Sequence, residues 1–192
     1  GQSHSVDFTK TRSRGDDTFS IHLGWERVPS SFDLDLNAFC KDKYGRWGVV
    51  QPLGENFGFY YSFPFLLLHG DNRVGGGRGE LITGSVGKIV RNLQWFGIGL
   101  LNYGSRRPLS QVKGAVTTVK LPGEPPIVIE HGGQNTSVCS ILQIHVVGSE
   151  LRVQHDLKAL RYGLKPWQPS SPEQALDKHW SFGEDWSPGR KD

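Results

Sequence analysis

Residues 32–40 read FDLDLNAFC, and the alternation of apolar and polar side chains over residues 32–38 indicates the fold class of this chain. Because successive side chains of a β-strand point to opposite faces, this period of two predicts a half-buried strand. The apolar face is formed by Phe32, Leu34, Leu36 and Ala38. The polar face carries Asp33, Asp35 and Asn37, which places the two aspartates about 7 Å apart on one side of the strand.

The same alternation recurs on both sides of this stretch. In DTFSIHLGW, residues 17–25, one face is formed by Phe19, Ile21 and Leu23. Short apolar or alternating runs continue to about residue 156 and give about ten strands. The 25 glycines and 11 prolines indicate many turns. The sequence therefore predicts an all-β fold, a β-sandwich of two antiparallel sheets with a short C-terminal helix or tail.

Three regions are expected along the chain. Residues 1–15 are polar and predict a flexible leader, residues 16–160 form the sandwich, and residues 161–192 form a tail with a short helix packed on it. Within the sandwich, residues 85–92 predict a single helical turn. A hairpin is expected to turn at residues 147–150.

The tail carries one clear helix signal. Ser171 has the properties of an N-cap, Pro172 suits the first helical position, and Gln174 completes the spacing of a capping box. The tail is expected to pack on the sandwich through three tryptophans, Trp167, Trp180 and Trp186.

Composition restricts the class of protein. The net charge is +3, with 22 basic and 19 acidic residues spread along the chain, so no nucleic-acid partner is expected. No apolar run has the length of a transmembrane helix and no secretory signal stands at the start. A cytoplasmic location is therefore expected, with peripheral membrane association left open. Cys40 and Cys139 stand far apart in apolar runs and fit buried thiols better than a disulfide or a zinc site.

A second polar motif is HGDNRVGGGRGE, residues 69–80. Its Asp71, Asn72 and Glu80 offer side-chain oxygens, and the aspartates of residues 32–40 offer more. Calcium takes about six to eight oxygen ligands, and glycines allow backbone carbonyls to turn toward an ion. The two motifs together form a candidate calcium site.

Two other interpretations of this loop stay open. It also fits a solvated polar turn, and it fits an anion cradle in which Arg73 and Arg78 add to the glycine N–H groups. An EF-hand is excluded because Arg73 and Gly75 stand where that loop needs oxygen ligands. Phosphate loops of nucleotide-binding proteins precede a helix, whereas apolar strand residues follow this loop.

No enzymatic motif is present. The seven histidines include no H-E-x-x-H spacing, and no G-x-S-x-G surrounds a serine. Single histidines on strand faces are usually structural. The sequence therefore predicts a protein that is not an enzyme, and no catalytic residue is assigned.

Several of these motifs together resemble a known family. LGWE followed by SFDLDLNAFC resembles the opening of the TerD family of tellurium-resistance and stress-response proteins. LLLHGDNRVGGGRGE resembles that family's GDNxTGxGxGDDE loop, and LSQVKGAVTTVK resembles a later strand more loosely. The resemblance covers roughly residues 18–156, with the two acidic motifs in the family's order. It identifies the chain as a divergent member.

The resemblance implies a calcium-binding β-sandwich without enzymatic activity, associated with tellurite resistance and bacterial stress responses. Carried over by position, the metal ligands are Asp33, Asp35, Asp71, Asn72, Gly75, Gly77 and Glu80.

Some positions depart from the family's pattern. Gly76 and Arg78 stand where the family has acids, so fewer carboxylates are present and a guanidinium enters the loop. At most one weakly held calcium ion is therefore expected. In the ion's absence, Arg78 is expected to bridge Asp33 or Asp35.

The expected function is that of a non-enzymatic TerD-like stress and tellurite-resistance protein with a degenerate calcium site and an unidentified protein partner. The alternative is a metal-free interaction scaffold, which binds a protein or an anionic ligand through the loop that holds Arg73 and Arg78.

Overall fold

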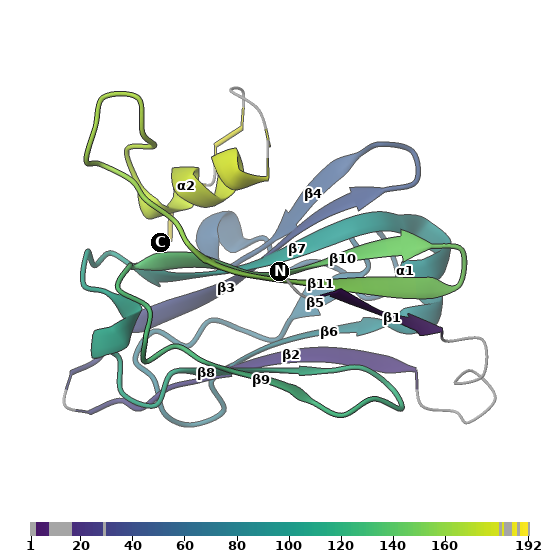
Figure 1. Ribbon diagram of the computed structural model, residues 1–192, viewed down its shortest axis with the longest axis horizontal. Helices are drawn as coiled ribbons and strands as arrows, with labels where there is room; N and C mark the ends of the chain where they lie inside the picture. Colours follow the sequence, from purple (N-terminus) through teal and green to yellow (C-terminus); the bar gives the residue numbers. More distant parts are fainter. Residues whose placement is uncertain are drawn as a thin grey trace.

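The computed structural model describes residues 3–7, 17–28, 30–180, 182, 186–187 and 189–191. Two antiparallel sheets are stacked on each other, and a short helix lies outside them (Figure 1). The predicted all-β fold with two antiparallel sheets is therefore confirmed.

The first sheet has six strands in the order β1-β11-β10-β7-β3-β4. Their bounds are β1 Ser3–Asp7, β11 Glu150–Ala159, β10 Val138–Val147, β7 Leu93–Tyr103, β3 Asp33–Asp42 and β4 Trp47–Val50. β3 holds the stretch FDLDLNAFC except its first residue and pairs with β7 along its whole length. β10 and β11 form the expected hairpin, whose last pair joins Val147 and Glu150.

The second sheet has five strands in the order β5-β6-β2-β8-β9. Their bounds are β5 Leu66–Leu68, β6 Glu80–Ser85, β2 Thr18–Gly24, β8 Val116–Lys120 and β9 Ile127–Glu130. The polar loop of residues 69–79 connects β5 to β6. The loop lies at the end of the sandwich where β3 begins, because Glu80 at the start of β6 accepts a hydrogen bond from Leu36 N of β3.

Both predicted helical segments are present. Helix α1 spans Val86–Asn92, and Ser85 Oγ accepts a hydrogen bond from Lys88 N. Helix α2 spans Pro172–His179, with proline in its first turn and Ser171 Oγ accepting from Gln174 N at 3.2 Å. The predicted N-cap at Ser171 is therefore confirmed, whereas Gln174 Oε1 accepts from Ser170 N and Ser170 Oγ instead of from the N-cap amide that a capping box uses. Two 3₁₀ turns, Leu53–Glu55 and Leu109–Gln111, complete the helical elements of the described residues.

The main core lies between the sheets. The alternating apolar residues of β2 are fully buried; they are Phe19, Ile21 and Leu23. The ring of Phe19 packs edge to face on that of Phe96 of β7, with ring centroids 5.4 Å apart. Leu34, Leu36 and Ala38 of β3 face the same core. Period two in the sequence has thus placed the apolar side chains of both strands between the two sheets.

The opposite face of β3 is also buried, which the sequence pattern does not show. Asp35 and Asn37 have no exposed surface. A second apolar cluster covers this face and includes Phe39 of β3 together with Leu176 and Trp180 from the α2 region. The polar face of β3 is therefore enclosed by the tail instead of being in water.

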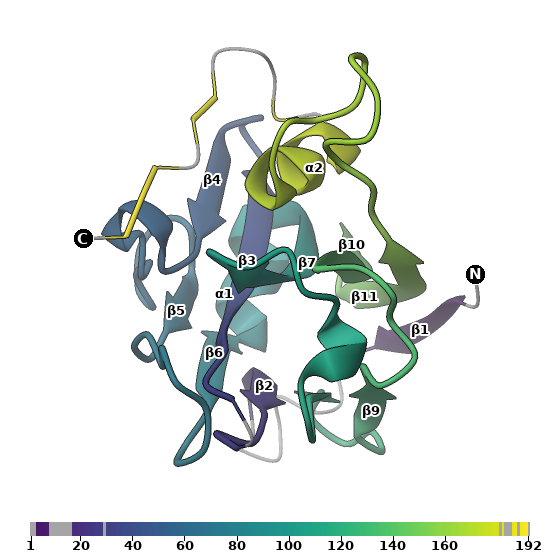
Figure 2. The ribbon, with the colours of Figure 1, turned by 90° about the vertical axis from the view of Figure 1, so that its left-hand side faces the viewer.

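Helix α2 packs on β7, where two glycines make room for it (Figure 2). A Cβ atom at Gly99 would lie 2.5 Å from the Leu176 side chain, and one at Gly97 would lie 2.7 Å from Trp180. The packing of the tail through Trp180, and partly through Trp186, is confirmed.

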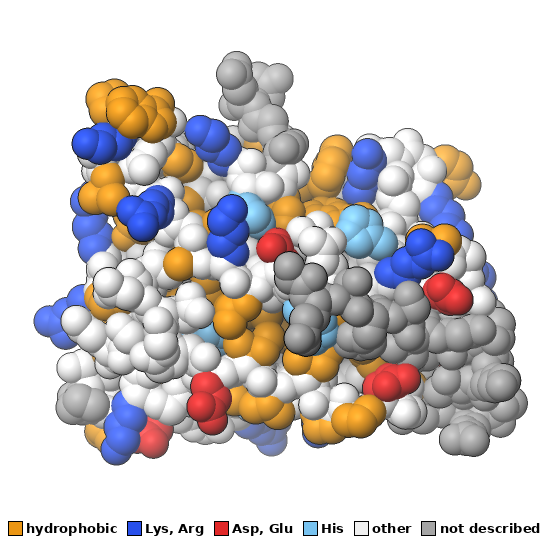
Figure 3. All heavy atoms as spheres, viewed as in Figure 1, with side chains coloured by type: hydrophobic (Ala, Val, Ile, Leu, Met, Phe, Trp, Pro, Cys, Tyr) orange, Lys and Arg blue, Asp and Glu red, His pale blue; other side chains and the backbone are white. Residues whose placement is uncertain are grey.

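Trp167 corrects the expectation for the third tryptophan, because its side chain is 73% exposed. It belongs to a turn that forms its own hydrogen bonds, in which Gln168 Oε1 accepts from Leu164 N and Lys165 N. This turn holds Trp167 and Leu164 away from the body of the protein. Figure 3 shows hydrophobic side chains at the corresponding corner, over the loop that precedes α2.

The expected leader contains a strand. Ser3–Asp7 forms β1 at the edge of the first sheet, paired with β11, so this part of residues 1–15 belongs to the sheet. The other residues of the leader lie outside the described ranges. No helix in the described part of the chain is long and apolar enough to cross a membrane.

Candidate functional site

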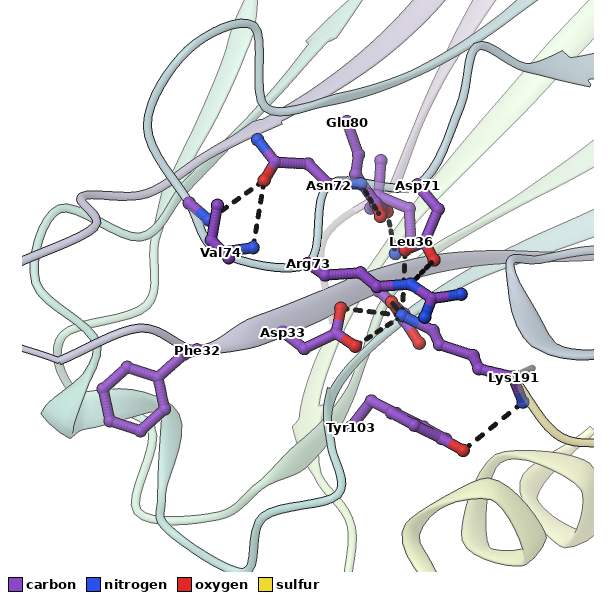
Figure 4. A network of polar contacts seen from close by, with 12 residues as sticks. Phe32, Asp33, Leu36, Asp71, Asn72, Arg73, Val74, Glu80, Tyr103 and Lys191 are labelled. Carbon is purple, nitrogen blue, oxygen red and sulfur yellow. Dashed lines mark hydrogen bonds and ion pairs between the residues drawn. The ribbon is translucent and has the colours of Figure 1, made fainter.

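Three aspartates converge where β3 begins (Figure 4). Asp33 and Asp35 project from β3 in the first sheet, and Asp71 comes from the loop between β5 and β6 of the second sheet. One carboxylate oxygen from each lies within 4.8 Å of the other two. We call these three residues the aspartate cage. The structure thus brings together the two acidic motifs that are separated in the sequence.

The side-chain ammonium of Lys191 lies inside this cage. Lys191 Nζ donates to Asp35 Oδ1 at 2.6 Å, to both carboxylate oxygens of Asp33 at 2.7 Å and to Asp71 Oδ1 at 2.9 Å. The Lys191 side chain is only 3% exposed. A single cationic group therefore joins both acidic motifs from a position far along the chain.

Burial and the ammonium group have opposite effects on these acids. Burial raises the pKa of Asp35 well above its ordinary value, and the positive charge of Lys191 only partly opposes this. Burial also raises the pKa of Asp33. For Asp71, burial acts in the same direction, but hydrogen bonds from Lys191 and Arg73 outweigh it and leave the pKa lowered.

The pKa of Lys191 is raised. Burial alone would lower it, but the charge of Asp35 and the hydrogen bonds to the three aspartates outweigh that effect. Lys191 is therefore an ammonium ion across the physiological pH range, and it brings a positive charge into the cage.

Glu80 lies beside the cage and joins the two sheets, and its role as a metal ligand stays a prediction. Its Oε2 accepts from Leu36 N of β3 at 2.9 Å, and its Oε1 accepts from Asn72 N at 3.3 Å. Glu80 begins β6, so it ties the second sheet to β3 of the first. Burial raises its pKa well above the ordinary value, and the negative charge of Asp35 adds to this.

Asn72 organises the glycine loop. Its Oδ1 accepts from Val74 N at 3.1 Å and Gly75 N at 3.0 Å, and its Nδ2 donates to Gly76 O at 2.9 Å. Both polar atoms of this amide are thus turned toward the loop backbone.

The predicted glycine ligands have different surroundings. Gly75, at φ +83°, packs against Trp25, whose Nε1 would lie 2.5 Å from an added Cβ. Gly77 also has a positive φ, of +60°, but a Cβ there would meet no described atom within 4 Å. Gly75 therefore fits a packing role, and the ligand roles of both glycines stay predictions.

The two loop arginines differ in their contacts. Arg73 Nε pairs with Asp71 Oδ2 at 2.8 Å, on the outer side of the cage. The carbonyl of Arg78 lies 2.8 Å from His22 Nε2, and no ion pair joins its guanidinium to an acid among the described residues. The structure therefore corrects the expected bridge from Arg78. The cation that joins Asp33 and Asp35 is Lys191, which sequence reasoning missed because a lone lysine in the tail belongs to no motif.

The cage fits a hard divalent cation in its chemistry. It offers carboxylate oxygens, which calcium prefers. Asp35 Oδ2 is buried, and no hydrogen-bond donor among the described residues reaches it. An acceptor without a partner in a buried acidic site is the kind of group that an ion would satisfy. The Lys191 ammonium and a metal ion, however, need the same space.

Comparisons with known proteins show similarity to a tellurium resistance protein and to two solved structures. No family model matches the chain. It is 27% identical over 189 residues to the tellurium resistance protein TerA of an Alcaligenes species, an alignment that covers 89% of this chain and 52% of TerA. The chain thus spans about half the length of this curated relative.

Two solved structures share the fold. One is a homologue of the telluride resistance protein TerD from Streptomyces coelicolor A3(2), with a TM-score of 0.60, 15% identity, and coverage of 82% of this chain and 94% of that one. The other is a protein of unknown function, with a TM-score of 0.60, 17% identity, and coverage of 76% and 90%.

Proposed function

We propose that this chain, which the comparisons support as a divergent member of the TerD/Ter family, acts as a non-enzymatic tellurium-resistance and stress-response protein with one calcium site in its aspartate cage. One observation carries the proposal. Carboxylates from both sheets, Asp33 and Asp35 on β3 and Asp71 on the glycine loop, converge on a single point.

The ion would have a structural effect at this point. Asp33, Asp35 and Asp71 would hold it, and it would supply a positive charge that ties the start of β3 to the loop between β5 and β6. Without such a charge, the buried carboxylates would repel each other. This repulsion would push the loop that carries Asp71 away from β3. Ordering of this end of the sandwich by the ion would then control the surface that it offers to a protein partner.

The cysteines support a non-enzymatic role. Both Cys40 and Cys139 are buried, and burial raises the pKa of each thiol, to about 12 for Cys139. The reactive form of cysteine is the thiolate, which is scarce at neutral pH when the pKa is this high. These thiols are therefore poorly suited to reduce a tellurium oxyanion.

A second candidate function is favoured by one surface feature. His69, Arg73 and Arg78 line the same shallow depression on the glycine loop. A protein partner with an acidic group, or a small anion, fits such a surface without any metal. In this alternative, the chain is a metal-free interaction scaffold.

Calcium titration of chelator-treated protein, followed by calorimetry, tests the first proposal. We expect binding that is abolished by Asp71→Ala and unchanged by Glu124→Ala, which removes an exposed acid from another loop. Absence of binding and of any thermal shift up to millimolar calcium would reject the calcium site. A thermal shift with phosphate or sulfate, lost in Arg78→Ala, would favour the scaffold instead.

A further inference from the structure

We propose that the aspartate cage is also a receptor for a primary ammonium group, that Lys191 is its tethered occupant, and that Lys191 and calcium exclude each other. The calcium half of this exchange rests on the proposed function. Its consequence is that ion binding releases the segment around Lys191 from the body of the protein.

The positions of the atoms make the two occupants exclusive. Lys191 Nζ lies 2.6 to 2.9 Å from oxygens of all three aspartates. Calcium binds oxygen at about 2.3 to 2.6 Å, so an ion held by the same three carboxylates would occupy nearly the same point. Two cations cannot share that point, and the lysine side chain must leave before the ion enters.

The cage offers more acceptors than the lysine uses. An ammonium group has three N–H donors, and Lys191 directs them to Asp33, Asp35 and Asp71. This leaves Asp35 Oδ2, on a side chain with no exposed surface, without a donor among the described residues. Calcium can bind both oxygens of one carboxylate and can therefore satisfy the acceptor that lysine leaves unpaired.

Lys191 is held by its neighbours as well as by the cage. Gly54 N donates to the carbonyl of Arg190 at 2.9 Å, and Gly189 approaches the Gly54 backbone closely. Tyr103 contributes on the other side, because its hydroxyl accepts from Lys191 N at 3.4 Å and its ring lies 4.8 Å from Nζ. Residues 189–191 therefore form a docked segment that reaches the cage past the 3₁₀ turn Leu53–Glu55.

This attachment sets the competition between the two occupants. A tethered group acts at a high effective concentration, often millimolar, which favours the lysine. A divalent ion carries twice its charge and uses more of the carboxylate oxygens, which favours calcium once its concentration is high enough. Calcium can bind only those molecules in which Lys191 has left the cage. The apparent dissociation constant for calcium should therefore equal the intrinsic constant divided by the fraction of such molecules.

Calcium titration of three proteins tests the exchange. We expect Lys191→Met to bind calcium about tenfold more tightly than the wild type, since the competitor is gone. Arg190→Met is the matched control, because it removes a neighbouring charge whose side chain is exposed, and it should bind like the wild type. Equal or weaker binding by Lys191→Met would overturn the exchange.

A measurement on the wild type covers the case in which Lys191→Met does not fold. The Gly54 amide, which donates to Arg190, should exchange its hydrogen faster when calcium is added, because the segment undocks. The Lys43 amide, which donates to Asn92 O just past the other end of β3, is the internal control and should not change. Unchanged exchange at Gly54 with calcium bound would also overturn the proposal.

The outcomes separate this inference from the proposed function. Calcium binding by the wild type and Lys191→Met with equal affinity overturns only the exchange. Absence of calcium binding in both proteins overturns the calcium site and the exchange together.

Binding of a primary ammonium group by the aspartate cage is tested separately. Butylammonium chloride should raise the melting temperature of Lys191→Gly more than an equal concentration of sodium chloride does. Asp35→Asn in the same background should remove the difference. Equal effects of the two salts on Lys191→Gly would overturn the ammonium receptor.

Discussion

Lys191 Nζ lies 2.6 Å from Asp35 Oδ1, although 156 positions of the sequence separate the two residues. Both side chains are almost fully buried. A charge that leaves water without a partner is strongly unfavourable, so each of these groups depends on the other. This one contact therefore links the strand that decides the fold to the end of the described chain.

Removal of the ammonium should destabilise the protein. We expect Lys191→Met in the presence of a chelator to lower the free energy of unfolding by about 3 kcal/mol, because the three carboxylates of the cage lose the ammonium group that pairs with all of them. Urea unfolding gives this value. The added change Asp35→Asn should restore part of the loss.

The control for this variant is Lys120→Met, which removes an exposed lysine at the end of β8. This change should leave the free energy of unfolding almost unaltered. If Lys120→Met lost as much stability as Lys191→Met, the change in net charge, and not the contacts in the cage, would be responsible.

The glycine loop should tolerate substitution at one glycine and not at the other. Gly75→Ala would place a Cβ atom 2.5 Å from Trp25 Nε1, which itself donates to Phe32 O at the start of β3. We expect a loss of about 3 kcal/mol in the free energy of unfolding, from strain and the displaced indole. Gly77→Ala should cost about 1 kcal/mol, because only its positive φ opposes alanine. Equal losses in thermal melts would contradict the packing role of Gly75.

Helix α2 should depend on one buried leucine. Leu176 is almost fully buried against Gly99, and Leu176→Ala leaves a cavity at this contact. We expect the free energy of unfolding to fall by about 3 kcal/mol. In the variant, amide hydrogens should exchange faster in α2 than in β7. Leu164→Ala, which changes a side chain that is 67% exposed, should leave both quantities unaltered.

Acid should destabilise the protein partly through His131. This side chain is buried, its Nε2 lies 2.7 Å from Thr117 Oγ1, and burial lowers its pKa to about 4. Between about pH 6.5 and pH 4, His131 binds a proton in the unfolded chain but stays neutral in the folded chain. The stability that His131 contributes is therefore present above this pH range and is lost as the pH falls through it.

The expected contribution of His131 is about 2 kcal/mol between pH 7 and pH 4.5. Urea unfolding of the wild type and His131→Gln at both pH values isolates it from the carboxylates, which titrate in both proteins. If the two proteins lose the same stability on acidification, His131 does not carry this effect.

Local sequence patterns predicted much of the sandwich. β2 and β3 followed from period two, because a strand that faces a core needs apolar residues at every second position. Helix α2 followed from Ser171 and Pro172, because capping acts within one turn of the chain. The chemistry of Asp33, Asp35 and Asp71 and the resemblance of their motifs to a family predicted these ligands, and the fold brings them together.

The remaining features depend on contacts between distant segments. The burial of Asp35 depends on α2 and the tail, which cover the face of β3 that alternation alone would leave in water. The exposure of Trp167 depends on the hydrogen bonds of its own turn, which hold it off the body. The replacement of the expected Arg78 by Lys191 depends on where residues 189–191 cross the sandwich.

Local sequence patterns thus predicted the all-β class, the hairpin at residues 147–150, the capped helix and the acids that could attract a cation. These features depend on residues close together in the chain, where backbone geometry fixes which side chains share a face. Which cation the acids contact depends on the folded arrangement of distant segments. Asp35 and Lys191 are partners because the chain returns to the start of β3 after 156 positions, and no local pattern encodes that return.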